Sequence, residues 1–467
     1  MKGLLWVFFE KVGVTVLSLI AMFWYAKLLG PVDFGLSIVI LSASLFVSTI
    51  IENVQQYPLI ATKENVGSAF KSSAIGWLIL SSLIATGLFV LLTFVYGNDW
   101  WLLILFAVVY IPVSSFSRIY IADLILKQKF KQLAIRAFWG KIIGVLTGLI
   151  TAYFGYVEFA IILQSLTVIV VSLIVMVITN KTLIKQSESF SLVLFKSLVI
   201  EGVPSGVAII EQNVKSHGLI VLLGIFAGAH ISGIYSLAVK FVDIPRTLIG
   251  LGFSTWAMGK FNQVMGNKSK LLDVFNTAML CCCSVILPCY VGMMAVSEAL
   301  ILEFFAREWF GAAKIIFFLS LYQAIVSFYI YLPPLQVLYK ATYRTLWVNV
   351  VSTSCIILSI IFLSDNFGIY APLIGMFSSL LFTIPKYTFE IVELLETRVL
   401  AIMHIIYGVV ISVALMYVLI DFAEKSLIVN NFYVLVIFGV VSYSLIFTVF
   451  NLANIINRKI LANIKSL

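Results

Sequence analysis

The stretch Ala26-Lys27-Leu28-Leu29-Gly30-Pro31-Val32-Asp33-Phe34-Gly35 closes one long apolar segment of the chain and opens the next. Pro31 cannot continue a preceding helix, and Gly30 and Gly35 bracket the break, so the pattern predicts a turn between two helices. A second stretch with the same glycine spacing follows in the middle of the chain, Gly228-Ala229-His230-Ile231-Ser232-Gly233. Two copies of one hairpin indicate an internal duplication.

The composition is that of a multi-pass membrane protein. Of the 467 residues, 62% are hydrophobic and 11% are charged, and the mean hydropathy is +1.11. A water-soluble fold could not keep this much apolar material off its surface. The net charge of +9 would suggest a nucleic-acid partner in a soluble protein. Here the basic residues lie in short breaks between apolar runs, so we expect membrane lipids and no nucleic acid as partners.

The apolar runs predict an all-α integral membrane protein with about 14 transmembrane helices. Their approximate centres are Leu17, Ser44, Leu83, Val108, Leu146, Val168, Gln212, Pro245, Leu287, Gln323, Ile357, Ile374, Ile411 and Gly439. The duplication predicts two pseudo-symmetric lobes around a central cavity. We expect a six-helix lobe at residues 1–180, a second six-helix lobe at 181–395, and two additional helices at 396–467.

The distribution of lysine and arginine predicts the orientation of the chain, because the cytoplasmic side retains these residues in excess. Basic residues and acidic residues alternate from one break to the next, and the basic breaks lie on the cytoplasmic side if the N-terminus does. Both termini should therefore be cytoplasmic. One basic break, Leu126-Lys127-Gln128-Lys129-Phe130-Lys131, is similar to Tyr339-Lys340-Ala341-Thr342-Tyr343-Arg344 in the second half, which supports the duplication.

Charged residues inside the apolar runs are the strongest functional signal, because each costs about 2.5–3.5 kcal/mol at the centre of a bilayer. Five of them lie near mid-depth: Lys141, Glu211, Lys215, Lys240 and Asp243. Three more lie nearer the inner end of their span: Arg118, Asp123 and Arg246. Such side chains must face protein or water, so they predict a polar cavity.

The spacing of these charges leaves two interpretations open. Glu211 precedes Lys215 by four residues, the favoured order for an ion pair within a helix, and Lys240 and Asp243 are three residues apart. Either the pairs neutralise themselves and join helices, or they line the cavity beside the second glycine hairpin. Pro245 lies in the same segment and should break or kink its helix, as helices at transporter sites do.

Other candidate sites are weaker. Lys27 lies near the outer end of the first span, where its position alone predicts a surface anchor. The five cysteines lie in apolar runs without metal-ligand partners, so we expect packing residues and no cofactor. The sequence contains no phosphate-binding glycine loop, no H-E-x-x-H motif and no long loop for paired catalytic carboxylates. A transporter is therefore favoured over an enzyme.

The opening stretch resembles the A-R-x-L-G-x-x-x-F-G signature of the polysaccharide flippases within the multidrug/oligosaccharidyl-lipid/polysaccharide exporter superfamily. The same resemblance is carried by Gly233-Ile234-Tyr235-Ser236-Leu237-Ala238 with Lys240, by residues 298–309, and by the basic break after the fourth span. It implies a bundle in the bacterial inner membrane that alternates between inward-open and outward-open states. It also implies that Lys27 faces the cavity as a diphosphate ligand, although lysine lacks the bidentate fork of the family's usual arginine.

The resemblance further implies the substrate, an undecaprenyl-diphosphate-linked oligosaccharide destined for O-antigen, capsule or another surface glycan. The expected substrate-binding residues are Lys27, Lys141, Glu211, Lys215, Lys240, Asp243 and Arg246. A coupling H+ or Na+ ion is one candidate driving force, and the membrane potential is the other. Glycan polymerase and export machinery are candidate protein partners.

Two other functions remain as alternatives. A cation-coupled multidrug exporter of the same superfamily would need carboxylates to dominate its cavity, whereas lysines outnumber them here. A membrane glycan polymerase or ligase would need a long outer loop with catalytic groups, and the outer breaks are short.

Overall fold

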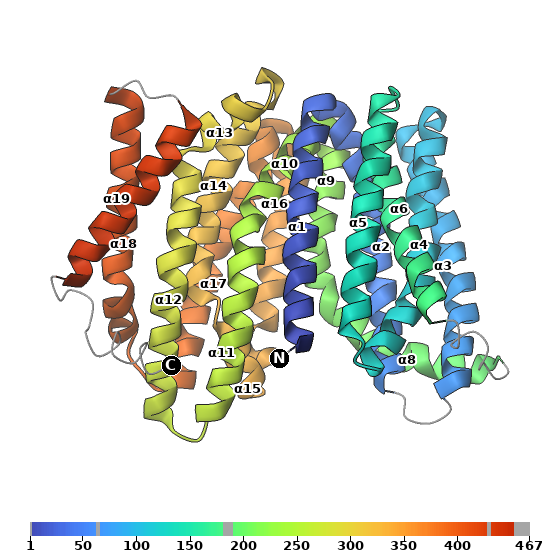
Figure 1. Ribbon diagram of the computed structural model, residues 1–467, viewed down its shortest axis with the longest axis horizontal. Coiled ribbons are helices and arrows are strands. Elements are labelled where there is room, and N and C mark those ends of the chain that lie inside the picture. The colour runs from blue at the N-terminus through green and yellow to red at the C-terminus, as the bar shows by residue number, and fades with distance from the viewer. Residues whose placement is uncertain (1, 62–65, 181–189, 427–430, 453–467) are drawn as a thin grey trace. The chain divides into compact units, whose positions relative to one another are not determined.

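The computed structural model describes residues 2–61, 66–180, 190–426 and 431–452 (Figure 1). These residues form helices and no strand. Up to residue 226 the main helices are α1 (Lys2–Leu28), α2 (Pro31–Ala61), α3 (Val66–Tyr96), α4 (Trp101–Leu126), α5 (Phe130–Tyr153), α6 (Ala160–Thr179), α8 (Leu192–Asn213) and α9 (Leu219–Phe226). After it come α10 (Ala229–Pro245), α11 (Leu251–Val264), α12 (Lys268–Ala295), α13 (Ser297–Phe304), α14 (Gly311–Val326), α15 (Leu332–Leu338), α16 (Leu346–Phe367), α17 (Ala371–Leu395), α18 (Val399–Ser426) and α19 (Phe432–Leu452).

The prediction of an all-α multi-pass membrane protein is confirmed. Within the described ranges, eleven helical segments are long and apolar enough to cross a membrane, and the segment from Thr342 to Leu395 contains both α16 and α17. All fourteen predicted span centres lie in helices. The cytoplasmic location of both termini stays a prediction, and residues 453–467 lie outside the described part of the chain.

The first glycine hairpin is a turn, but it is shorter than predicted. Helix α1 ends at Leu28 and α2 begins at Pro31, the first helical position, where the missing N–H of proline is not needed. Gly35 therefore lies inside α2 and does not bracket the turn. In the second copy α10 begins directly after Gly228, whose φ of +87° suits glycine, and Gly233 likewise lies inside α10.

The contacts divide the chain into two compact units, residues 1–236 and 237–467. The first unit extends past the long inner break because α8 and α9 pack along α2. Small residues permit the approach: a Cβ on Gly202 would meet the carbonyl group of Val54, and one on Gly224 would meet the side chain of Val39. The lobes predicted at 1–180, 181–395 and 396–467 follow from sequence repeats and stay a prediction.

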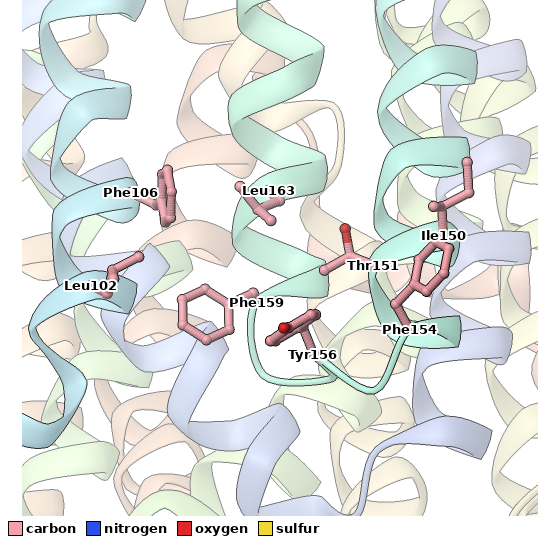
Figure 2. A pocket seen from close by; sticks show the side chains of 8 residues that line it. All are labelled: Leu102, Phe106, Ile150, Thr151, Phe154, Tyr156, Phe159 and Leu163. Carbon is pink, nitrogen blue, oxygen red and sulfur yellow. The ribbon is translucent and has the colours of Figure 1, made fainter.

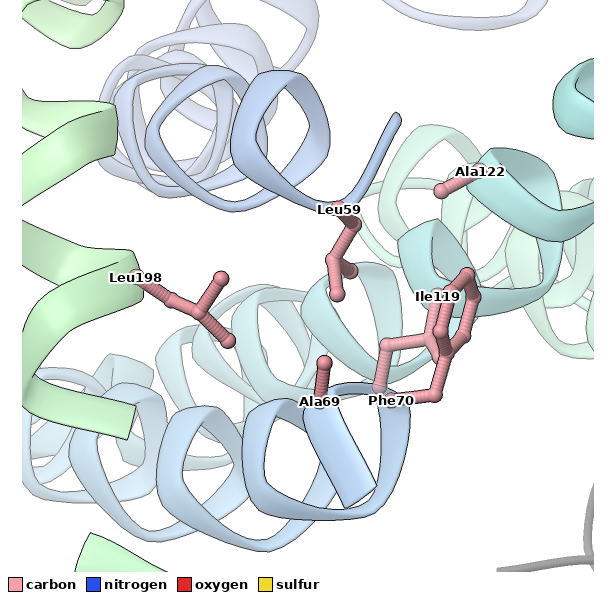
Figure 3. Packing of buried hydrophobic residues seen from close by; sticks show 6 residues of the cluster. All are labelled: Leu59, Ala69, Phe70, Ile119, Ala122 and Leu198. Atoms are coloured by element: carbon pink, nitrogen blue, oxygen red, sulfur yellow. The ribbon is translucent and has the colours of Figure 1, made fainter. Parts of the chain in front are cut away.

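The first unit has an apolar core where α2, α3, α4 and α8 converge (Figure 3). Its buried members are Leu59, Ala69, Phe70, Ile119, Ala122 and Leu198. A second cluster, formed by Tyr120, Ile121, Leu124, Leu133 and Met176, joins α4 to α5 and α6. Helix α4 thus uses adjacent faces for two cores, which holds its polar residues at defined positions.

In the second unit α12 packs against α14 and α18, and α16 packs along α17. The aromatic rings of Phe261, Phe275 and Tyr331 contact one another, with ring centroids 5.9–6.2 Å apart. The Tyr331 hydroxyl donates a hydrogen bond of 3.1 Å to the carbonyl oxygen of Ala278 on α12. Cys282 and Cys283 are buried in the same helix.

The two similar basic breaks have the same backbone conformation. Gln128 and Lys340 both have a φ of +52°, which is unusual for residues with a side chain. The N–H of Gln128 bonds to the carbonyl three residues earlier and the next N–H to the carbonyl five residues earlier, and Lys340 repeats this pattern. The structural match pairs Lys127 with Tyr339, one residue away from the sequence alignment. A shared helix-ending turn therefore accompanies the shared basic sequence.

Candidate functional site

Lys27 and Lys141 lie on two neighbouring helices of the first unit but at different levels. Helices α1 and α5 run side by side, since a Cβ on Gly13 would touch Phe138 and one on Gly148 would meet the Tyr25 hydroxyl. Lys27 is in the last turn of α1 and is exposed, whereas Lys141 lies half-buried in the middle of α5. The two lysines do not form one cluster.

Glu211 and Lys215 form the ion pair that their spacing predicts. About one third of each side chain is exposed, 32% for Glu211 and 33% for Lys215. The pair sits where α8 passes into a π-helical turn, η2 (Val214–Gly218), which continues as α9. Such π-helical insertions are rare and occur often at functional sites. Because about one third of each side chain is exposed, the ion pair is accessible and is not sealed between packed helices.

Polar contacts with α2 set the position of this ion pair. The Asn213 side chain donates a hydrogen bond of 2.7 Å to the carbonyl oxygen of Phe46. The Ser205 hydroxyl donates one of 2.9 Å to the carbonyl oxygen of Asn53. These bonds join α8 to α2 on both sides of Glu211 along the chain, so the helix cannot rotate freely about its axis.

Lys240, Asp243 and Arg246 lie together in the second unit. Pro245 ends α10, a second π-helical turn, η3 (Arg246–Gly250), follows, and α11 continues the helical segment. Lys240 and Arg246 are exposed and Asp243 is half-buried. Asp243 interacts electrostatically with Arg246 and with Lys240. The helix interruption predicted at Pro245 is thus a π-helical turn at the charged residues.

A partly buried polar network that was not predicted from the sequence lies in the first unit. Glu52 of α2 forms an ion pair with Arg118 of α4, which also donates a hydrogen bond of 3.0 Å to Gln56. Beside them the Gln55 side chain accepts a bond of 3.2 Å from Ser115. The signal in the sequence was the charge of Glu52 within the second apolar run.

Asp123 is also paired within the first unit. Its carboxylate accepts a hydrogen bond from the Asn180 side chain and forms an ion pair of 2.8 Å with Lys127. The hydrogen bond between Asn180 and Asp123 joins the end of α6 to the end of α4. This charge near the inner end of its span therefore has a structural partner.

Known proteins share this sequence pattern and this arrangement of helices. The family model described as polysaccharide biosynthesis protein matches residues 25–314. No curated protein matches the sequence. Among solved structures, the lipid II flippase MurJ in an inward closed conformation has a TM-score of 0.75 at 15% identity, covering 96% of this chain and 98% of that one.

Two further solved structures have lower scores. The Vibrio cholerae MATE transporter VcmN, solved as a mutant, has a TM-score of 0.52 at 11% identity, covering 85% of this chain and 97% of that one. A superfamily transporter from Pyrococcus furiosus has a TM-score of 0.51 at 13% identity, covering 84% of this chain and 95% of that one, and is described as having a binding pocket of reverse polarity. The chain has the fold of these transporters, and it belongs to the polysaccharide biosynthesis protein family.

Proposed function

We propose that this protein moves an undecaprenyl-diphosphate-linked oligosaccharide from the cytoplasmic to the outer leaflet of a bacterial inner membrane. The observation that carries the proposal is the exposure of Lys240 and Arg246 in the middle of the helical segment 229–264. If this segment is the eighth span that the sequence predicts, a cation in it is costly unless it contacts water or a counter-ion. An anionic diphosphate supplies that counter-ion, and the sugars follow it across the membrane.

The charge balance of the proposed substrate-binding residues favours an anion. Five are basic, Lys27, Lys141, Lys215, Lys240 and Arg246, and two are acidic, Glu211 and Asp243. Glu211 is paired with Lys215, and Asp243 interacts with both of its basic neighbours, so a positive excess remains. Arginine can bind phosphate in a bidentate manner and lysine as a point charge.

The proposed transport cycle is alternating access, in which the charged residues face one side of the membrane and then the other. With the cell interior negative, outward movement of an anion gains about 2.3 kcal/mol per charge per 100 mV. Glu211 or Asp243 could instead take up H+ or Na+ as a coupling ion. Flipping measured in proteoliposomes with an imposed potential, pH gradient or Na+ gradient distinguishes these driving forces.

The decisive experiment is deletion of the gene followed by analysis of lipid-linked intermediates. We expect undecaprenyl-linked repeat units to accumulate on the cytoplasmic face, and re-expression of the protein to restore the surface glycan. Repeat units that reach the outer leaflet normally in the deletion strain would contradict the proposal. Accumulation of flipped but unpolymerised units would point to a polymerase, the partner activity that we expect downstream.

The multidrug exporter is the weaker candidate, because the exposed charged side chains of the segment 229–264 are Lys240 and Arg246. These cations would repel the cationic drugs expected for such a protein. For the Pyrococcus furiosus transporter, the reverse polarity of the binding pocket is described as suggesting a different function, so pocket charge is a useful criterion in this superfamily. Unchanged drug susceptibility in the deletion strain is the expected result.

A further inference from the structure

An apolar groove lies on the first unit between α4 and α5, with α6 as its floor (Figure 2). Helix α6 packs against both neighbours, whereas α4 and α5 make few contacts with each other. The space left between them has a volume of about 440 Å³, within the ~300–1,000 Å³ typical of ligand sites. Its lining residues are Leu102, Phe106, Ile150, Thr151, Phe154, Tyr156, Phe159 and Leu163.

The groove is lined mainly by aliphatic and aromatic side chains. Phe106 and Phe159 meet edge to face with ring centroids 6.3 Å apart, which joins the α4 wall to the floor. Gly155, with a φ of +89°, makes the tight turn that brings the end of α5 to the start of α6. Phe154 and Tyr156 stand on either side of this turn and rim the groove (Figure 2).

The lining has almost nothing to offer a polar ligand. The Thr151 hydroxyl already donates a hydrogen bond of 2.8 Å to the carbonyl oxygen of Thr147 within α5. Tyr156 supplies the other side-chain hydroxyl, and no lining residue is charged. Water, sugar or phosphate in this groove would lose hydrogen bonds without replacement. The chemistry therefore selects hydrocarbon.

The position of the groove identifies the source of that hydrocarbon. It is open on the surface: Ile150 is 55% exposed, Phe154 71% and Tyr156 63%. Its residues lie in the last turns of α5 and the first turns of α4 and α6, all of which belong to candidate membrane spans or to the turn between two of them. The distribution of basic residues assigns this end to the outer leaflet. Exposed Trp101 and Tyr153 nearby suit the interface between hydrocarbon and headgroups.

We propose that the groove binds one acyl chain of an outer-leaflet phospholipid, which fills the space between α4 and α5 at this end of the unit. The lining carries no group that recognises a headgroup, so the most abundant lipid of the leaflet is the expected occupant. The polyprenyl chain of the transported lipid is the rival occupant, and its preferential binding would overturn the proposal. The bound chain stabilises the first unit at its outer end.

The test is native mass spectrometry of the full-length protein released from detergent, with counting of retained phospholipid. Leu163→Trp fills the floor of the groove and should lower the number of phospholipids retained per protein by one. Ile150→Trp should have the same effect from the rim. Ile174→Trp, an exposed position on α6 outside the groove, is the matched control and should retain it. The melting temperature and gel-filtration profile of each variant establish that it is folded.

A photoactivatable phospholipid with a diazirine in its acyl chain gives the second readout, in reconstituted bilayers. We expect adducts on peptides that contain Phe106 and Phe159, lost in Leu163→Trp and not reduced by added undecaprenyl phosphate. Equal phospholipid retention by Leu163→Trp, Ile150→Trp and wild type would overturn the proposal. So would displacement of the adducts by undecaprenyl phosphate.

Discussion

Gly35 of α2 and Gly233 of α10 lie directly against each other, backbone to backbone. A Cβ on Gly35 would meet the carbonyl oxygen of Ala229, and a Cβ on Gly233 would meet the carbonyl oxygen of Pro31. Each carbonyl belongs to the residue four positions before the opposing glycine, so the contact is reciprocal. The two copies of the hairpin that the sequence repeats thus meet at equivalent residues, and only glycine permits an approach this close.

Alanine at either glycine should destabilise the protein strongly. Both obstructing atoms belong to helix backbones, which cannot move aside as a flexible side chain can, so we expect a loss of about 3 kcal/mol or more for Gly35→Ala and Gly233→Ala. Gly87→Ala is the control, since a Cβ there meets nothing within 4 Å, and alanine should favour the helix by ~0.5–1 kcal/mol. Thermal unfolding of the purified protein measures the difference. Equal melting temperatures for the three variants would contradict the contact.

The two basic turns should be improved by glycine. Gln128 and Lys340 hold a left-handed conformation that costs a residue with a side chain about 1–2 kcal/mol. Gln128→Gly and Lys340→Gly should therefore raise the melting temperature. Gly155→Ala should lower the melting temperature, because its φ of +89° is strained for alanine. No atom lies within 4 Å of the added Cβ, so this variant tests the backbone strain alone. A lower stability of both glycine variants would mean that the side chains contribute more than the strain costs.

Loss of one partner of the Glu52 and Arg118 ion pair should be more damaging than loss of both. Removal of one member of a buried pair leaves an uncompensated charge and costs about 3–5 kcal/mol. We expect a penalty at the lower end of this range for Glu52→Gln and for Arg118→Gln, because 28% of the Arg118 side chain is exposed, and partial recovery in the double variant. Lys425→Ala removes an exposed pair with Asp421 and should cost at most about 1 kcal/mol.

A double-variant cycle of unfolding free energies checks this coupling between Glu52 and Arg118. Additive losses in the double variant would show that the two charges act independently, against the contact seen in the structure.

Removal of the accessible lysines should stop transport without loss of the protein from the membrane. Lys215→Ala and Lys240→Ala are expected to fail to restore the surface glycan in a deletion strain, because the anionic headgroup loses its counter-charge. Lys240→Arg keeps the charge and should retain activity. Lys196→Ala, an exposed lysine near the start of α8, is the control. Normal glycan export by both alanine variants, at equal membrane abundance, would refute the charged binding site.

Much of this protein could be predicted from local sequence features. Apolar runs place the helices, and Gly30 with Pro31 places a helix break, because hydropathy and backbone restriction act over a few residues. The ion pair of Glu211 and Lys215 was predictable for the same reason, since four residues make one helical turn. The extent of the hairpin was not, because Pro31 can start a helix as well as end one.

The sequence by itself therefore determined the class of protein, its helices, and the recurrence of the glycine hairpin and of the basic turn. The tertiary structure alone decided which helix faces meet: Gly35 against Gly233, Glu52 beside Arg118, and the open groove between α4 and α5. The physical reason is that a lipid-facing surface and a helix-packing surface are equally apolar in a membrane. Hydropathy cannot distinguish them, and the contacts between distant segments do.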